Sequence, residues 1–290
     1  MKLVFTLVSL LAAAGAFAET RALVIAGLGG TPEYETEFQR QAHESAERLR
    51  ALAADVVVLA GPEASRERLQ GELAALSRRA AAGDTAVVLL IGHGSFDDRD
   101  YRFNLPGPDP TGADLAAWLA ELRAERQLVV VATSASGALQ ELFADPRRAV
   151  ITATRSGGER NVTVFSHYFT AALSDASADT DKDGYVSSVE AFRFAETAVA
   201  GHYEQRKQMA TEHPVLDGPE IPLQLARLDG GAEPSPLPAG AGERLAELEA
   251  EIAALKANKE DYEPDDYYAR LQSLLLEVAL LRRQPGTDGS

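Results

Sequence analysis

The chain has 290 residues, of which 46% are hydrophobic and 25% charged, a composition typical of a globular protein. Lys and Arg number 28 and Asp and Glu number 44, which gives a formal net charge of −16. A surface this acidic argues against nucleic acid and anionic membranes as partners and favours divalent cations. The absence of cysteine excludes disulfides, thiolate metal ligands and a cysteine nucleophile.

Residues 1–18 are predicted to be a signal peptide. Lys2 supplies the positive end, residues 3–14 form an apolar run, and Ala16-Phe17-Ala18 is a small-x-small cleavage signal. The run is too short to anchor the chain in a bilayer, and no later stretch is long and apolar enough to span one. We therefore expect cleavage after Ala18 and a periplasmic or secreted protein. The alternative is a buried first helix.

Between residues 19 and 227, short apolar runs alternate with amphipathic segments, which predicts one α/β domain. The runs are nearly continuous in Val, Ile and Leu, as expected for a mostly parallel sheet with helices on both faces. Strands are expected at Arg21–Leu28, Asp55–Gly61, Ala86–Gly94, Gln127–Thr133 and Ala149–Thr154. Helices are expected at Glu35–Leu52, about Ala64–Ala82, Thr111–Leu122 and Val189–Tyr203.

Residues 179–190, DTDKDGYVSSVE, match an EF-hand calcium loop at every ligand position. Such a loop needs oxygen ligands at positions 1, 3 and 5, a backbone carbonyl at 7, often a held water at 9, and a bidentate Glu at 12. The corresponding residues are Asp179, Asp181, Asp183, Tyr185, Ser187 and Glu190, with Gly184 at the sharp turn. We expect one structural Ca²⁺ that stabilises the following helix. The alternative is an acidic surface turn that only caps that helix.

A linker and an α-helical hairpin are expected to follow the α/β domain. Residues 228–242 are rich in Pro, Gly and small residues. In residues 243–283, apolar side chains recur with 3-4-3 spacing on either side of Pro264, which marks the start of a second helix. The two stripes are Leu245, Leu248, Ile252 and Leu255, and Leu271, Leu274, Val278 and Leu281. Each stripe spans about two heptads, so packing within the chain is favoured, and self-association through the hairpin is the alternative.

Two of the predicted strands end in residues able to carry chemistry. His93 lies between Gly92 and Gly94, and Ser134 directly follows the strand Gln127–Thr133. In parallel sheets, functional groups gather at the carboxyl ends of the strands. An imidazole and a hydroxyl from adjacent strands would face one another there, with backbone N–H groups as donors to an oxyanion. A glycine-flanked His is also common in structural turns, so the pattern alone leaves both interpretations open.

The sequence around these residues resembles legumain-like (asparaginyl endopeptidase) peptidases, in particular an exported bacterial branch. The similar strings are IGHGS, ATSASG, RAVITATRSGGERN, GLGGTPEYETEF, FNLPGPDPTGADL and TEHP, within Arg21–Leu223. The resemblance implies the caspase-type α/β fold of that family. It also implies that His93 corresponds to the catalytic His and Ser134 to the catalytic Cys.

A serine at the cysteine position leaves two functional hypotheses. A thiol beside an imidazole ionises near neutral pH, whereas a serine hydroxyl needs a positioned base that is usually oriented by a carboxylate. Candidate carboxylates are Asp97, Asp98 and Asp100. We favour a calcium-binding module with impaired catalysis that holds a peptide or protein in its cleft. The alternative is an active hydrolase with Ser134 as nucleophile and His93 as general base.

Overall fold

The computed structural model describes residues 18–81, 83–219 and 221–228 and, in the C-terminal part, 244, 247–248, 251–252, 254–255, 258–259 and 262–283. Residues 1–17 of the predicted signal peptide and residues 229–243, which include most of the predicted linker, lie outside the described residues. The chain divides into two compact units, Met1–Asp229 and Gly230–Ser290.

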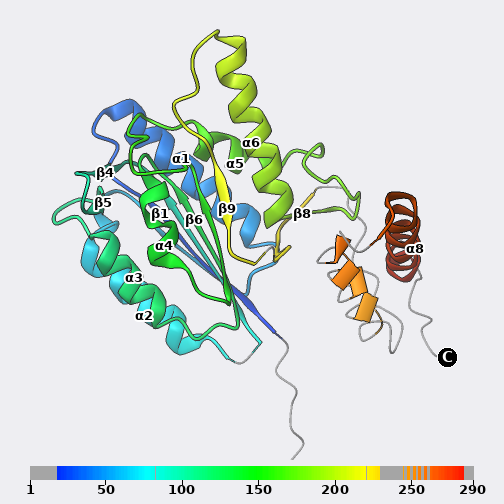
Figure 1. The fold of residues 1–290 in the computed structure, drawn as a ribbon. Helices are drawn as coiled ribbons and strands as arrows, with labels where there is room; N and C mark the ends of the chain where they lie inside the picture. The colour runs from blue at the N-terminus through cyan, green and yellow to red at the C-terminus, as the bar shows by residue number, and fades with distance from the viewer. Residues whose placement is uncertain are drawn as a thin grey trace, which may run out of the picture. The chain divides into compact units, whose positions relative to one another are not determined.

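The first unit is a mixed α/β structure with a mostly parallel central sheet (Figure 1). Its strand order is β2 (Asp55–Leu59), β1 (Thr20–Ala26), β3 (Thr85–Ile91), β6 (Arg126–Ala132), β7 (Arg148–Thr152) and β9 (Val215–Asp217). The first five strands run parallel, and β9 pairs antiparallel with β7. Every residue of β3 is buried, which explains its uninterrupted apolar sequence.

Helices cover both faces of this sheet, as Figure 1 shows. One face packs against α1 (Pro32–Leu49), α5 (Phe165–Ala172) and α6 (Ser188–Gln205). The other packs against α2 (Arg66–Arg79), α3 (Gly112–Ala120) and α4 (Gln140–Phe143). Neighbouring residues of a strand serve opposite faces: Val24 joins the first core and Leu23 the second. The sheet is therefore buried on both sides.

Capping residues set the helix boundaries. Helix α1 begins at Pro32, three residues before the predicted start, because Thr31 accepts the N–H of Tyr34 and proline suits the first helical position. Helix α6 begins at Ser188 with a capping box between Ser187 and Glu190. The last residues of the predicted calcium loop thus also define the start of a helix.

Several short elements were not predicted from the sequence. Strands β4 (Gly94–Phe96) and β5 (Tyr101–Phe103) form a hairpin after His93, and β8 (Tyr185–Ser187) pairs antiparallel with β10 (Gln224–Arg227). Two 3₁₀ turns cover Gly61–Glu63 and Ser136–Leu139. Strands of three or four residues are too short to display a recognisable alternation of apolar and polar side chains.

In the second unit, α8 covers Pro264–Arg283. A separate apolar cluster contains residues from both predicted stripes: Leu248, Leu255, Tyr267 and Leu274 are buried, with Ile252, Tyr262, Leu271 and Val278 packed against them. Leu245 and the side chain of Leu281 lie outside the described residues. Among the helices of the described part of the chain, none combines the length and apolar character needed to cross a membrane.

Candidate functional site

The sheet register brings His93 and Ser134 to the same level at its carboxyl edge. Strands β3 and β6 are parallel neighbours, and Ile91 at the end of β3 pairs with Ala132 at the end of β6. Each candidate residue stands two positions beyond this pair. The register therefore places both residues at the same level on adjacent strands, at the carboxyl edge of the sheet.

His93 is oriented by a backbone carbonyl. Its Nε2 lies 3.1 Å from the carbonyl oxygen of Gly29, and because a carbonyl only accepts, Nε2 carries the proton and Nδ1 keeps a free lone pair. The imidazole makes T-shaped contacts with the rings of Tyr34 and Phe38. Their centroids lie 5.2 and 5.0 Å from that of the imidazole. Burial lowers the pKa of His93, and the bond to Gly29 opposes this shift only in part.

The Ser134 hydroxyl is engaged with the backbone of Gly94. Its side chain is buried, its Oγ donates to the Gly94 carbonyl at 3.1 Å, and the Gly94 N–H lies 3.4 Å from the same Oγ. The hydroxyl proton is thus directed at a carbonyl oxygen. The Gly94 N–H, a predicted oxyanion donor, points at the hydroxyl itself.

Close packing fixes Gly94 and Ser134. A side chain at Gly94 would place its Cβ 2.5 Å from the carbonyl oxygen of Ser134 and 2.5 Å from the Tyr101 hydroxyl. The Tyr101 hydroxyl pairs with Thr133 at 2.7 Å, and Thr133 Oγ1 donates to the Ser134 carbonyl at 3.1 Å. Burial raises the pKa of Tyr101, so it remains a neutral phenol. Only glycine fits at position 94 without displacing its neighbours.

The turn after Ser134 is equally constrained. Ala135 is buried with a left-handed φ of 56°, and its N–H donates to the Glu159 carbonyl at 2.8 Å. The next hydroxyl, Ser136 Oγ, lies 3.2 Å from Thr154 Oγ1 and accepts the Thr154 N–H. Ser136 therefore ties this turn to the end of β7.

The candidate orienting carboxylates Asp97 and Asp98 are paired with arginines. Asp97 binds Arg102 at 3.1 Å, and Asp98 forms an ion pair with Arg160. Backbone N–H bonds, that of Asp100 first, and then Arg102 lower the pKa of Asp97 to about 2. Asp100 is exposed and contributes its carbonyl oxygen to the Asp97 N–H at 3.4 Å.

A carboxylate–imidazole pair does occur near this edge, but between other residues. Glu159 Oε1 lies 2.6 Å from His213 Nδ1, and Glu159 Oε2 accepts the His213 N–H at 3.1 Å. His213 belongs to the segment TEHP, whose Glu212 is buried and accepts the N–H of Val164 at 2.7 Å. Burial raises the pKa of Glu212. The family-like strings contain Glu159, Glu212 and His213, but they give no pairing.

The predicted calcium loop gathers three carboxylates. One oxygen each from Asp179, Asp181 and Asp183 lies within 4.8 Å of the other two. Asp179 is buried, and its two oxygens accept the N–H groups of Asp183 and Gly184 at 3.2 and 3.1 Å. Gly184 has a φ of +86°, which explains why glycine is required at the turn.

Glu190 reaches back over the start of the loop. Its Oε1 accepts the N–H and the hydroxyl of Thr180 at 2.8 and 2.9 Å, and its Oε2 accepts the same two groups of Ser187 at 2.9 and 2.8 Å. Burial alone would raise the pKa of Glu190, but these hydrogen bonds outweigh it and lower the pKa. Position 12 is therefore tied to positions 2 and 9 of the loop by these hydrogen bonds.

The donor set fits a hard divalent cation. The ammonium of Lys182 donates to the carbonyls of Ala176 and Asp179. Carboxylate, carbonyl and hydroxyl oxygens around a flexible turn suit Ca²⁺, which accepts six to eight oxygen ligands in irregular geometry. The structure thus brings the three aspartates together, whereas Glu190 is not part of this cluster and bonds to Thr180 and Ser187.

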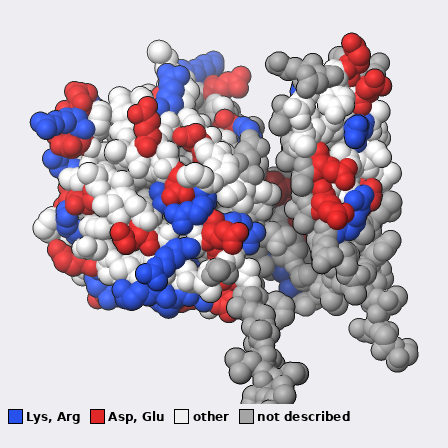
Figure 2. Space-filling model, turned by 60° about the horizontal axis from the view of Figure 1, so that its bottom comes forward, with Lys and Arg blue, Asp and Glu red and all other residues white. Residues whose placement is uncertain are grey.

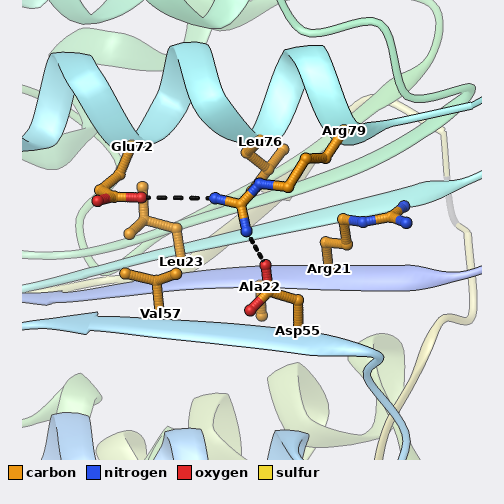
Figure 3. Close-up of a pocket in the computed structure, with 8 residues that line it drawn as sticks. All are labelled: Arg21, Ala22, Leu23, Asp55, Val57, Glu72, Leu76 and Arg79. Carbon is orange, nitrogen blue, oxygen red and sulfur yellow. Dashed lines mark hydrogen bonds and ion pairs between the residues drawn. The ribbon is translucent and has the colours of Figure 1, made fainter.

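Two hollows lie elsewhere on the first unit. One, of about 10 Å³, is a packing gap between α2 and strands β1 and β2, closed by ion pairs of Arg79 with Asp55 and Glu72 (Figure 3). The other, of about 290 Å³, is lined by residues 144–146 and 217–219 together with Arg148 and Val150. Neither includes a predicted site residue. Basic and acidic side chains are interspersed on the face drawn in Figure 2.

No protein-family model and no curated protein matches the chain. Among solved structures, protein GSU0716 from Geobacter sulfurreducens is 15% identical, with 73% of this chain and 97% of that chain covered and a TM-score of 0.47. Caspase-1 from Spodoptera frugiperda is 11% identical, with 75% and 93% covered and a TM-score of 0.48. At these values neither similarity assigns a family or a function to this chain.

Proposed function

We propose that this protein is an exported, calcium-binding module with a legumain-like, caspase-type fold whose peptidase chemistry is impaired. In this proposal one Ca²⁺ binds in the loop 179–190. The edge of the sheet around His93 and Ser134 holds a peptide or protein ligand without cleaving it. The observation that carries the proposal is the convergence of Asp179, Asp181 and Asp183 in a loop with the full EF-hand pattern.

Calcium would take ligands from six loop positions. The carboxylates of Asp179, Asp181 and Asp183, the carbonyl of Tyr185, a water on Ser187, and Glu190 are the expected donors. When bound, the ion supplies positive charge that offsets the repulsion among the carboxylates. Glu190 would then exchange its bonds to Thr180 and Ser187 for the ion, which links calcium binding to the start of α6.

The impaired chemistry follows from how His93 is supported. A backbone carbonyl can fix the tautomer of an imidazole, but it lacks the negative charge with which a carboxylate stabilises an imidazolium. That support suffices for a thiol, which forms a thiolate–imidazolium pair before attack. It is inadequate for a serine, whose proton must be removed during attack. The bond from Ser134 to the Gly94 carbonyl adds a competing acceptor for the same proton.

One observation favours the hydrolase alternative. His93 Nδ1 keeps a free lone pair, and His93 lies at the same level as Ser134 on the adjacent strand. A rotation of the hydroxyl toward it would create a nucleophile–base pair and free the Gly94 N–H for an oxyanion. In this alternative Ser134 attacks an acyl carbon and His93 takes its proton.

A fluorophosphonate probe separates the two hypotheses. The impaired-module proposal predicts no labelling of the wild-type protein above that of Ser134→Ala. Labelling that disappears in Ser134→Ala would establish the hydrolase instead. As a matched variant, Ser134→Cys tests whether the hydroxyl alone accounts for the missing activity. We expect this variant to react with a thiol-directed peptide probe. Adding His93→Ala to it should abolish the reaction.

Terbium luminescence tests the calcium loop. Tyr185 at position 7 lies in the loop, so Tb³⁺ bound there would be sensitised by its ring, and Ca²⁺ would displace it. We expect Tyr185→Phe to lose the luminescence but keep the binding, because the ligand at this position is the backbone carbonyl. Sensitised emission that Ca²⁺ does not displace would contradict a calcium site.

Export and self-association complete the proposal. Mass determination of the protein recovered from the periplasm or medium should give a chain that starts at Glu19. Recovery of the uncleaved chain from the cytoplasm would contradict export.

Sedimentation of the chain with and without residues 243–290 tests whether the C-terminal hairpin mediates self-association.

A further inference from the structure

The predicted calcium loop holds the segment that leads out of the α/β unit. Its positions 7 to 9 form β8, which pairs antiparallel with β10: Tyr185 lies opposite Arg227 and Val186 opposite Ala226. The N–H of Leu228 donates to the carbonyl of Gly184, at loop position 6, at 3.0 Å. A single calcium loop has no second loop to pair with, and β10 supplies the paired strand.

The next residue of the loop region extends this connection. Ser188 is buried, its N–H donates to the Leu223 carbonyl at 2.7 Å, and its hydroxyl donates to the Ile221 carbonyl at 2.6 Å. The Leu223 N–H in turn donates to the Ser188 hydroxyl at 3.1 Å. Residues 221–228 are thus bound by consecutive positions, 184 to 188, of the loop and the start of α6.

This segment is also where the chain leaves the first unit. Leu228 is the last residue described before the second unit begins at Gly230. Leu223, Leu225, Ala226 and Leu228 are buried in the core that lies against α1 and α6. Release of β10 would therefore expose apolar side chains.

From these contacts we infer that calcium acts as a clamp on residues 221–228. The inference rests on the calcium site proposed above. Binding fixes the carbonyl of Tyr185 and the turn at Gly184, and so holds the partner strand in register. Without calcium, the Tyr185 carbonyl and the turn at Gly184 lose this support, and 221–228 opens more often. Calcium would thereby control how often the apolar side chains of 221–228 become accessible to solvent.

Hydrogen exchange of the full mature chain with and without Ca²⁺ tests the clamp, with calorimetry to confirm binding in the same samples. We expect calcium to slow exchange in peptides covering 221–228 by at least about tenfold, with an upper limit near 100-fold at 100 times the Kd. Peptides covering 85–91 in β3 should not change. Glu190→Gln at the same calcium concentration should show no slowing, and Mg²⁺ should not replace Ca²⁺.

Ser188→Ala separates the clamp from the calcium site, because it removes the two hydroxyl bonds, to the Ile221 carbonyl and from the Leu223 N–H, without removing a predicted ligand. We expect this variant to bind Ca²⁺ but to lose most of the calcium-dependent protection at 221–223. Calcium binding without slower exchange at 221–228 in the wild type would overturn the clamp and leave the calcium site standing. Absence of calcium binding by calorimetry would overturn both.

Discussion

The calcium loop and the His93–Ser134 edge differ in how the chain assembles them. The loop takes all its predicted ligands from twelve consecutive residues, so their spacing and one glycine at the turn determine where the carboxylates go. The edge takes one residue from each of two strands about forty residues apart, and its geometry depends on the hydrogen bonds that each side chain finds after folding. Local sequence therefore specifies the convergence of the three aspartates more completely than the geometry of the edge.

The two regions also differ in what a single substitution changes. At the edge, the Ser134 hydroxyl donates to the Gly94 carbonyl, and the chain has no cysteine to supply an ionisable thiol. In the loop, an isolated change removes one ligand of six. The comparison predicts large calcium effects that depend on Glu190, and small effects at Ser134 that concern stability only.

The largest expected effect is on thermal stability with calcium. At 100 times the Kd, a ligand that binds only the folded state stabilises it by about 2.7 kcal/mol, which corresponds to a rise in Tm of roughly 5–10 °C for a domain of this size. Glu190→Gln should remove most of this rise in scanning calorimetry. Glu196→Gln, which changes an exposed carboxylate on the same helix, is the matched control and should keep it.

Gly94→Ala should give the next largest effect. The added Cβ would lie 2.5 Å from the Ser134 carbonyl oxygen, so the variant should lose about 1–3 kcal/mol of unfolding free energy in urea. Gly71→Ala is the control: Gly71 lies within α2 with open space around it, and alanine there should stabilise by about 0.5–1 kcal/mol. Equal effects of the two variants would show that the edge is not closely packed.

Ser134→Ala should cost less, about 1 kcal/mol, because it removes one hydrogen bond and leaves the Gly94 carbonyl without its donor. Ser95→Ala, at an exposed serine on the neighbouring strand, should change stability by less than about 0.5 kcal/mol. Urea unfolding at neutral pH measures both. A loss in Ser134→Ala no larger than that in Ser95→Ala would contradict a stabilising bond from Ser134 to the Gly94 carbonyl.

The smallest effect is the pH dependence contributed by His93. Its pKa is lowered in the folded protein, so the folded state binds fewer protons than the unfolded state in this range. The stability linked to its neutral form is fully present above the unfolded pKa of about 6.5 and is lost as pH falls through the folded pKa. His93→Gln should flatten the stability profile below pH 6.5. A titration of the ring by NMR with a pKa at or above 6.5 would contradict the buried, carbonyl-bound geometry.

The sequence predicted the class of fold because the strands are long and uniformly apolar. The five parallel strands and four of the helices were expected within a few residues. Capping by Thr31 and Ser187 explains why α1 and α6 start earlier than expected. The short β4–β5 hairpin and the β8–β10 pair were missed, since three-residue strands carry no periodicity. Strand β9 was missed for the same reason, and its antiparallel direction follows from tertiary packing.

At the candidate edge, the sequence indicated the level of His93 and Ser134 but not their partners. Gly29, which orients His93, comes from the loop after β1, and no spacing rule connects it with residue 93. The Glu159–His213 pair joins two segments 54 residues apart. Such contacts arise only when the connections between the strands have folded against one another. In the loop, by contrast, the convergence of the aspartates followed from their spacing alone.

The central claim is that residues 179–190 form a single calcium site, and isothermal titration of the mature protein with Ca²⁺ tests it most directly. We predict one ion per chain with a non-cooperative isotherm, and no heat of binding in Glu190→Gln. A wild-type titration without binding heat, at calcium concentrations up to the millimolar range where weak extracellular sites are filled, would contradict the claim.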